Sequence, residues 1–142
     1  MNNKDLSSKK CVIVIDHTLP VGVIVNTAAV LSINLGKMVP EIVGHDHKDN
    51  VGDHHHGITT MAIPILKSNS QLLKEMRQAV KAHEPDLTVI DLITATQTTK
   101  NYADYVHQYE NTPIEQLEYL GLALYGEIKV VNKFTGSLGL LR

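Results

Sequence analysis

Histidines and aspartates are concentrated between Gly44 and Gly57, and their spacing suits a divalent metal ion. His45 and His47 are two residues apart, as are His54 and His56, so each pair points to one side of an extended backbone. Turn-forming residues around Asn50-Val51-Gly52 predict a hairpin that would bring the two pairs together. Imidazole nitrogens and carboxylates are typical ligands of zinc. The candidate metal ligands are His45, His47, Asp49, His54 and His56, with Asp46 and Asp53 nearby; the alternative is a solvated polar loop.

A second group of polar residues follows a predicted strand. The run Cys11–Ile15 is β-branched and uninterrupted, which predicts a central strand that is buried on both faces. Asp16 and His17 come directly after it and precede a predicted helix, and in open α/β sheets ligands bind at such strand ends. The pair is a candidate for acid–base chemistry or for ligand contacts. Alternatively, Asp16 orients the loop that follows.

Further candidate ligand contacts lie on that helix and near a second apolar run. Asn26 lies on the apolar helix and is expected to be buried, so its amide must be hydrogen-bonded. Its partner is either the backbone of a loop or a group in the crevice at the strand ends. The run from Leu87 to Ile93 predicts a second buried strand. If this strand and the first lie side by side and point the same way, their carboxylates open onto one shared hollow. The candidate ligand-binding residues are therefore Asp16, His17, Asn26, Asp91, Thr96 and Gln97.

Helical patterns alternate with strand patterns along the chain, which predicts one α/β sheet with helices on its faces. The first helix is expected from Val21 to Leu35, with Thr18 as a candidate cap and Gly36 just past its end. A capping box of Ser68 and Gln71 predicts a second helix that ends before Pro85. Asn101 is expected to cap a third helix with a tyrosine stripe, Tyr102, Tyr105 and Tyr109.

The carboxyl-terminal part is expected to add strands. Residues 119–125 are strand-like, and Leu138–Leu141 predicts a short terminal strand. The period of residues 128–134 fits either a strand or a helical turn. We expect a flexible lead-in at residues 1–9 and a single α/β domain at 10–142.

The composition is that of an ordinary globular domain. The chain has 142 residues, of which 43% are hydrophobic, and a net charge of -2. Its 13 lysines and arginines are scattered, which argues against nucleic acid as a partner. The single cysteine, Cys11, excludes an internal disulfide and is expected to be a buried thiol. Neither a signal peptide nor a membrane span is predicted, so we expect a cytoplasmic protein.

These segments resemble the family called domain of unknown function 2000. The matching residues are spread over nearly the whole chain: Val14-Ile15-Asp16, Asn26 to Leu31, Leu35-Gly36, Val43-Gly44, Asp49 to Gly52, His56-Gly57-Ile58, Tyr119-Leu120-Gly121, Gly126 and Lys133 to Arg142. That family is similar in fold to type 2 peptidyl-tRNA hydrolases. The resemblance therefore implies a mixed four-to-five-stranded sheet with helices on both faces.

Three stretches resemble the hydrolases themselves. Gly22 to Thr27 occupies the place of their Gly-Lys-Ile-Ala-Ala-Gln stretch, Asp91 to Gln97 is similar to their Asp-Ala-Gly-x-Thr-Gln, and Thr135 to Leu140 matches their Thr-Gly-x-Leu-x-Leu ending. The hydrolase lysine, however, is replaced here by Val23, which can neither carry charge nor hydrogen-bond an anionic substrate. The resemblance therefore implies a shared fold more than a shared chemistry.

Three functions are compatible with these patterns. The first is binding of a small ligand in the crevice near Asp16 and Asp91. The second is a metal-dependent hydrolase, with zinc or another divalent ion held by the His45–His56 cluster. The third is cleavage of a peptidyl or aminoacyl ester, as the hydrolase-like fold suggests. Self-association as a homo-oligomer through apolar strands or the tyrosine stripe is a further expectation.

Overall fold

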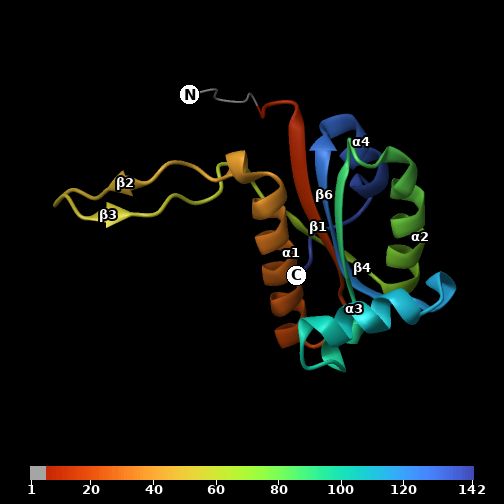
Figure 1. Cartoon of the computed structure of the whole chain (residues 1–142). Coiled ribbons are helices and arrows are strands. Elements are labelled where there is room, and N and C mark those ends of the chain that lie inside the picture. Colours follow the sequence, from red (N-terminus) through yellow and green to blue (C-terminus); the bar gives the residue numbers. More distant parts are fainter. Residues whose placement is uncertain (1–5) are drawn as a thin grey trace.

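The computed structural model describes residues 6–142 and shows a mixed four-stranded sheet between helices (Figure 1). The strands are β1 (Lys9–Asp16), β4 (Ile65–Ser68), β5 (Thr88–Ile93) and β6 (Tyr119–Glu127), in the order β4-β1-β6-β5. β4 is parallel to β1, whereas β6 runs antiparallel to both β1 and β5. The single α/β domain is thus confirmed. Of the predicted lead-in, residues 1–5 lie outside the described residues and Lys9 already begins β1.

The core is built by alternation along β1 and β6. Val12 and Val14 point to one face of the sheet, and Ile13 and Ile15 point to the other. Every residue of β6 except Glu127 is buried. Because side chains on both faces of these two strands are covered, they form the centre of the sheet, as was predicted for residues 11–15.

The predicted pairing of residues 11–15 with 87–93 is wrong. β6 lies between β1 and β5, and β5 is an edge strand whose residues are mostly half-buried. The two strands do point the same way, because each is antiparallel to β6. The longer apolar run of β6 takes the central place, whereas β5 carries the polar residues Thr88 and Asp91.

Helix α1 (Val21–Met38) covers one face of the sheet, and α2 (Ser70–Val80) and α4 (Ile128–Thr135) cover the other (Figure 1). α1 runs through Gly36 and ends before Pro40, whose ring nitrogen carries no hydrogen for the next helical bond. Thr18 does not cap it, because Pro20 occupies the N-cap position. Residues Thr27, Leu31 and Leu35 of α1 are buried against the sheet.

The other helices follow their predicted patterns with local corrections. Asn69, not Ser68, caps α2 by accepting from the Leu72 amide at 2.9 Å. Asn101 caps α3 (Tyr102–Asn111) as predicted, by accepting from the Asp104 amide at 2.9 Å. Residues 128–134 are helical in α4, and the predicted terminal strand is reduced to one bridge, Leu66 with Leu140. Short 3₁₀ helices span Pro40–Ile42, Lys81–His83, Thr94–Gln97 and Ile114–Gln116.

The predicted hairpin is present as β2 (His47–Lys48) and β3 (His54–His55). Gly52, at φ 93°, supplies the left-handed conformation that its tight turn requires. Residues 45–56 are all exposed, and the hairpin projects from the carboxyl-terminal end of α1 away from the sheet (Figure 1). It is therefore an arm on the outer side of α1 and does not belong to the core.

By length and composition alone, α1 is the one helix among the described residues that could cross a membrane. In the fold it packs on the sheet through three buried residues, and most of its other residues are half-buried or exposed.

Candidate functional site

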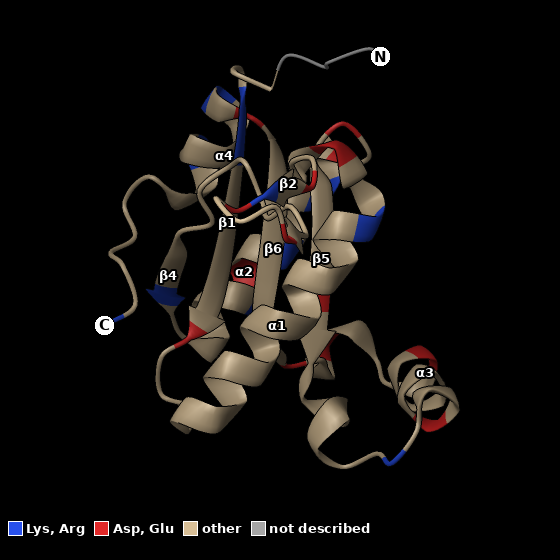
Figure 2. Cartoon of the chain, turned by 90° about the vertical axis from the view of Figure 1, so that its left-hand side faces the viewer, with Lys and Arg blue, Asp and Glu red and all other residues tan. Residues whose placement is uncertain are grey.

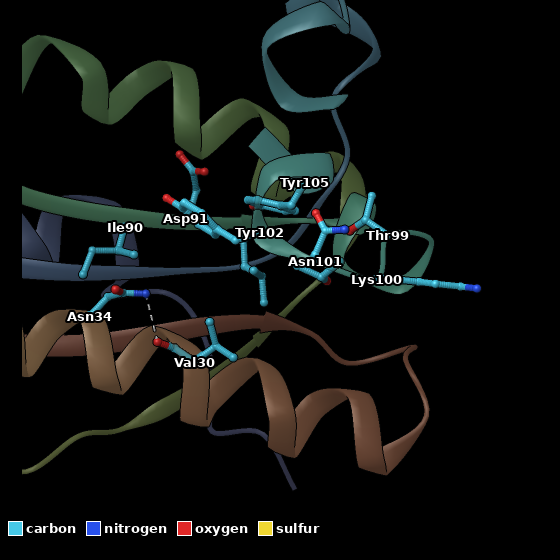
Figure 3. Close-up of a pocket in the computed structure, with 11 residues that line it drawn as sticks. Val30, Asn34, Ile90, Asp91, Thr99, Lys100, Asn101, Tyr102 and Tyr105 are labelled. Carbon is cyan, nitrogen blue, oxygen red and sulfur yellow. Dashed lines mark hydrogen bonds between the residues drawn. The ribbon is translucent and has the colours of Figure 1, made fainter. Parts of the chain in front are cut away.

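A pocket of about 530 Å³ opens at the β5 edge of the sheet, where α1 and the start of α3 approach it (Figure 3). This volume lies within the usual range for small-molecule sites. Its lining combines apolar side chains with amides, hydroxyls and one ammonium group: Val30, Asn34, Ile90, Asp91, Leu92, Thr96, Thr99, Lys100, Asn101, Tyr102 and Tyr105.

Two tyrosines of α3 form one wall of the pocket. The hydroxyl of Tyr105 accepts a hydrogen bond from the Ile93 amide at 3.2 Å, next to an irregularity in the β5–β6 register. This bond ties α3 to the end of β5. The Tyr102 ring stacks on Tyr105 with centroids 6.4 Å apart, yet Tyr102 is 80% exposed. The result is an aromatic platform with one face of the outer ring open to solvent.

The polar groups of the pocket are partly committed to the fold. The hydroxyl of Thr99 donates to the Ala95 carbonyl at 2.7 Å, and the Asn34 amide nitrogen donates to Val30 at 3.2 Å (Figure 3). The Lys100 ammonium makes no hydrogen bond or ion pair with residues 6–142 and extends away from the pocket floor in Figure 3. Lys100 is the one lysine or arginine among the lining residues, and its side chain would have to turn back toward the pocket to meet a ligand.

Asp91 lines the pocket through its place on β5, but its carboxylate points away from Asn34 toward α2 (Figure 3). There it accepts from Arg77 Nε at 2.9 Å and from the Tyr109 hydroxyl at 2.8 Å. The side chains of Arg77 and Asp91 are only 17% and 14% exposed. Burial, and then the neighbouring Asp91 charge, raise the pKa of Tyr109. This carboxylate thus belongs to a structural network on the α2 face.

Asp16 and His17 shape the loop between β1 and α1. Asp16 is buried, and its Oδ1 accepts from the backbone amide and hydroxyl of Thr18 at 2.9 and 2.7 Å. His17 Nδ1 lies 2.7 Å from the Ser68 carbonyl oxygen. Of the two interpretations of Asp16, this geometry is that of a residue that orients the loop.

The six predicted ligand contacts do not share one hollow. Asp91 and Thr96 line the pocket, whereas Asp16, His17, Asn26 and Gln97 are not among its lining residues. Asn26 was expected to be buried but lies on the exposed side of α1. The predicted crevice between Asp16 and Asp91 is wrong, because β6 separates their strands and Asp91 points to the face opposite α1.

The hairpin places its two histidine pairs on opposite sides. His47 lies directly across from His55, and Lys48 lies across from His54. Since residues opposite one another share a face, His45 and His47 project to one side, whereas His54 and His56 project to the other. The expectation that the hairpin brings the two pairs together is therefore wrong.

Contacts within the hairpin are local. The His47 and His55 rings stack at 5.8 Å, and His55 Nε2 lies 2.7 Å from Asp49 Oδ2. This hydrogen bond is the main reason that the pKa of Asp49 is lowered. His56 and Asp46 are 3.4 Å apart on the other side. Within residues 6–142, no three His, Cys, Asp or Glu side chains are arranged to hold a metal ion, and metal binding by the hairpin stays a prediction.

The sequence patterns missed Asn34 and Lys100 as pocket residues and assigned the tyrosine stripe to an interface for self-association. The usable signal was the predicted cap at Asn101, which starts α3 directly after a lysine and places Tyr102 at its first turn. No sequence pattern predicted that Val30 and Asn34 of α1 lie close to residues 90–92 of β5.

Comparison with known proteins gives a fold and a family. A structure of a protein of unknown function, Atu0240 from Agrobacterium tumefaciens strain C58, is similar with a TM-score of 0.84 and 21% identity, over 94% of this chain and 97% of that one. No curated protein matches the chain. The family described as protein of unknown function DUF2000 matches residues 9–142. The chain therefore belongs to the DUF2000 family.

Proposed function

We propose that the protein binds a small molecule that combines a planar ring with a carboxylate or phosphate, in the pocket at the β5 edge. The observation that carries this proposal is the exposed Tyr102 ring at the rim of a 530 Å³ pocket. A large aromatic side chain that is 80% exposed leaves apolar area in water, and a stacked ligand ring would cover it.

The polar lining supports an anionic group on that ligand. Lys100 directly precedes the α3 N-cap residue, and both it and Asn101 line the pocket. The amino-terminal turn of a helix carries a partial positive charge, of which the Asp104 carboxylate, 3.0 Å from Asn101 Nδ2, offsets a part. An anion held there would sit beside a ring stacked on Tyr102.

Binding is favoured over catalysis by what the lining residues already do. The one carboxylate among them, that of Asp91, is engaged by Arg77 and Tyr109. Cleavage of a peptidyl ester, which the resemblance to type 2 peptidyl-tRNA hydrolases implies, is further disfavoured by Val23. Its side chain is partly buried and packs into the apolar cluster beneath α1, a place suited to valine and not to a substrate-binding lysine.

Thermal-shift and ligand-observed NMR measurements with two matched panels test the proposal. One panel holds aromatic carboxylates and nucleoside monophosphates, and the other holds aliphatic acids and neutral aromatics. We expect binding from the first panel, with affinity reduced at least about tenfold in Tyr102→Ala and in Lys100→Ala. Lys81→Ala, on an exposed lysine outside the pocket, serves as the control. Equal binding of both panels, or ligands that bind both pocket variants unchanged, would contradict it.

A further inference from the structure

The outer side of α1 is an exposed apolar surface. Val21, Val25, Ile33 and Met38 are 63–77% exposed on this helix. Figure 2, which looks onto this side, shows α1 without a charged residue along most of its length. Asn26 and Lys37 are exposed on the same helix, so the apolar residues share this side with two polar ones. Exposed apolar residues gathered on one side of a helix are typical of an interaction surface.

Four residues of this outer side are arranged symmetrically about Ala29, whereas Val21 lies across from Lys37. Val25 and Ile33 lie four residues before and after Ala29, and Gly22 and Gly36 lie seven residues before and after it. In a two-fold contact between antiparallel helices centred on Ala29, each large residue would meet the other large one and each glycine the other glycine. The pattern thus fits a second copy of α1 as the partner.

The two glycines have no role inside the chain. A Cβ atom built on Gly22 or Gly36 meets nothing within 4 Å. A glycine within a helix costs about 0.5–1 kcal/mol relative to alanine, so internal packing does not explain Gly36. A second helix that approaches closely would explain both positions.

The hairpin 45–56 extends the same surface. It projects outward from the carboxyl-terminal end of α1, so helix and hairpin form two sides of a corner (Figure 1). In the antiparallel arrangement each hairpin passes the amino-terminal end of the partner's α1. Val51 at its tip is 77% exposed, which leaves an apolar side chain for that contact.

The area that a dimer needs agrees with a contact made by both parts. A helix of 18 residues offers a footprint of roughly 270 Å², from ~27 Å of length and ~10 Å of width. A stable interface buries about 800 Å² on each partner. The helices alone fall short of this area, so the dimer requires the hairpins to lie against the other copy as well.

A lipid surface fits this corner poorly. For α1 to lie flat on a bilayer, the projecting hairpin would have to enter the hydrocarbon layer with its histidines and aspartates. Three aspartates against one lysine also make the hairpin acidic, so it would be repelled by anionic headgroups.

We propose that this chain forms a two-fold dimer in which the outer sides of α1 pack antiparallel about Ala29 and each hairpin clasps the other copy. This surface is separate from the pocket, because Val25, Ala29 and Ile33 are not among the pocket residues.

Sedimentation equilibrium and light scattering between about 1 and 100 µM test the proposal. We expect twice the chain mass for the wild type. Val25→Glu and Ile33→Glu should each weaken association at least about 100-fold, while Ile114→Glu, at a 49% exposed position on the 3₁₀ helix Ile114–Gln116, should leave it unchanged. Gly36→Leu should also give monomers, with a melting temperature no lower than that of the wild type when both are monomeric. A monomeric wild type, or dimers that survive both glutamate variants, would overturn the proposal.

A crosslink gives an independent measure. Cys11 is buried, so Ala29→Cys would carry the one accessible thiol among the described residues. Mild oxidation should join two Ala29→Cys chains through a disulfide and leave the wild type unjoined. Failure to crosslink would overturn the antiparallel pairing. Flotation of the wild type with phosphatidylcholine–phosphatidylglycerol vesicles, lost in Ile33→Glu, would assign this surface to lipid and overturn the dimer.

Discussion

Helices α1 and α2 cover opposite faces of the same sheet, yet their outward sides differ in kind. α2 buries Leu73 and Val80 and exposes Gln71, Glu75 and Gln78. Its Gln71 and Glu75 side chains are joined by a 3.0 Å hydrogen bond. α1 buries Thr27, Leu31 and Leu35 and presents valine, isoleucine and glycine to solvent. The comparison teaches that core packing accounts for most of the apolar residues of α2, with Leu72 as the exception, but leaves the exposed valines and isoleucine of α1 unexplained.

The largest expected effect tests whether the two helices are equal as core elements. Leu31 and Leu73 are both fully buried, one under each helix. Leu31→Ala and Leu73→Ala should each lower the free energy of unfolding by about 2–5 kcal/mol, because each leaves a cavity. Urea denaturation of the two variants under monomeric conditions measures this. A loss below about 1 kcal/mol for Leu31→Ala would show that α1 is not anchored like α2.

The next effect concerns Tyr109 of α3, whose hydroxyl donates to the Asp91 carboxylate on the side of the sheet that α2 covers. Burial raises the pKa of Tyr109, so its neutral form is favoured in the folded state. Ionisation of the unfolded chain near pH 10 then favours unfolding, and stability is lost as the pH rises above that value. One such group contributes about 1.4 kcal/mol per pH unit. Tyr109→Phe should flatten the alkaline decline, measured by urea melts between pH 9 and 11, while Tyr102→Phe serves as the exposed control.

A smaller effect compares the starts of the helices. Asn69 caps α2 with its side chain, whereas Pro20 at the start of α1 offers no such bond. Asn69→Ala should therefore cost about 1 kcal/mol in thermal or urea unfolding. Asn69→Ser keeps an acceptor and should recover most of the loss. No loss in the alanine variant would mean that the α2 end is held by packing alone.

The smallest effect separates folding from association in α1. Gly36→Ala should raise the stability of the monomeric protein by about 0.5–1 kcal/mol, since an added Cβ meets nothing within 4 Å. Unfolding at submicromolar concentration measures this gain. A loss of stability there would show that Gly36 serves the chain's own fold.

How far the sequence predicts this molecule depends on whether a feature is local. The β1 strand, the Asn101 cap, the hairpin turn and the buried Cys11 follow from short patterns, and burial indeed raises the pKa of this thiol to about 11. The sequence did not decide between a strand and a helical turn for residues 128–134, because seven residues fit both periods. In the structure they are helical, and Val131 packs in the core.

The site depended on non-local choices that no pattern encodes. Strand order decided that β5 lies at the edge and that Asp91 faces Arg77, although its apolar run resembled that of a central strand. In the observed register His47 lies across from His55. Because neighbouring residues of a strand point to opposite faces, His54 and His56 then lie on the face opposite His45 and His47. Asn26 was misplaced because an apolar helix was equated with a buried one.

The central place of β6 has a consequence for how the chain folds. β1 begins at Lys9, while the strand between it and β5 ends at Glu127. Until that late segment leaves the ribosome, β1 and β5 lack their common neighbour and the nascent chain keeps apolar strand edges uncovered. Closure of the sheet therefore waits for β6, and a chain cut before Tyr119 is expected to aggregate instead of forming a smaller domain.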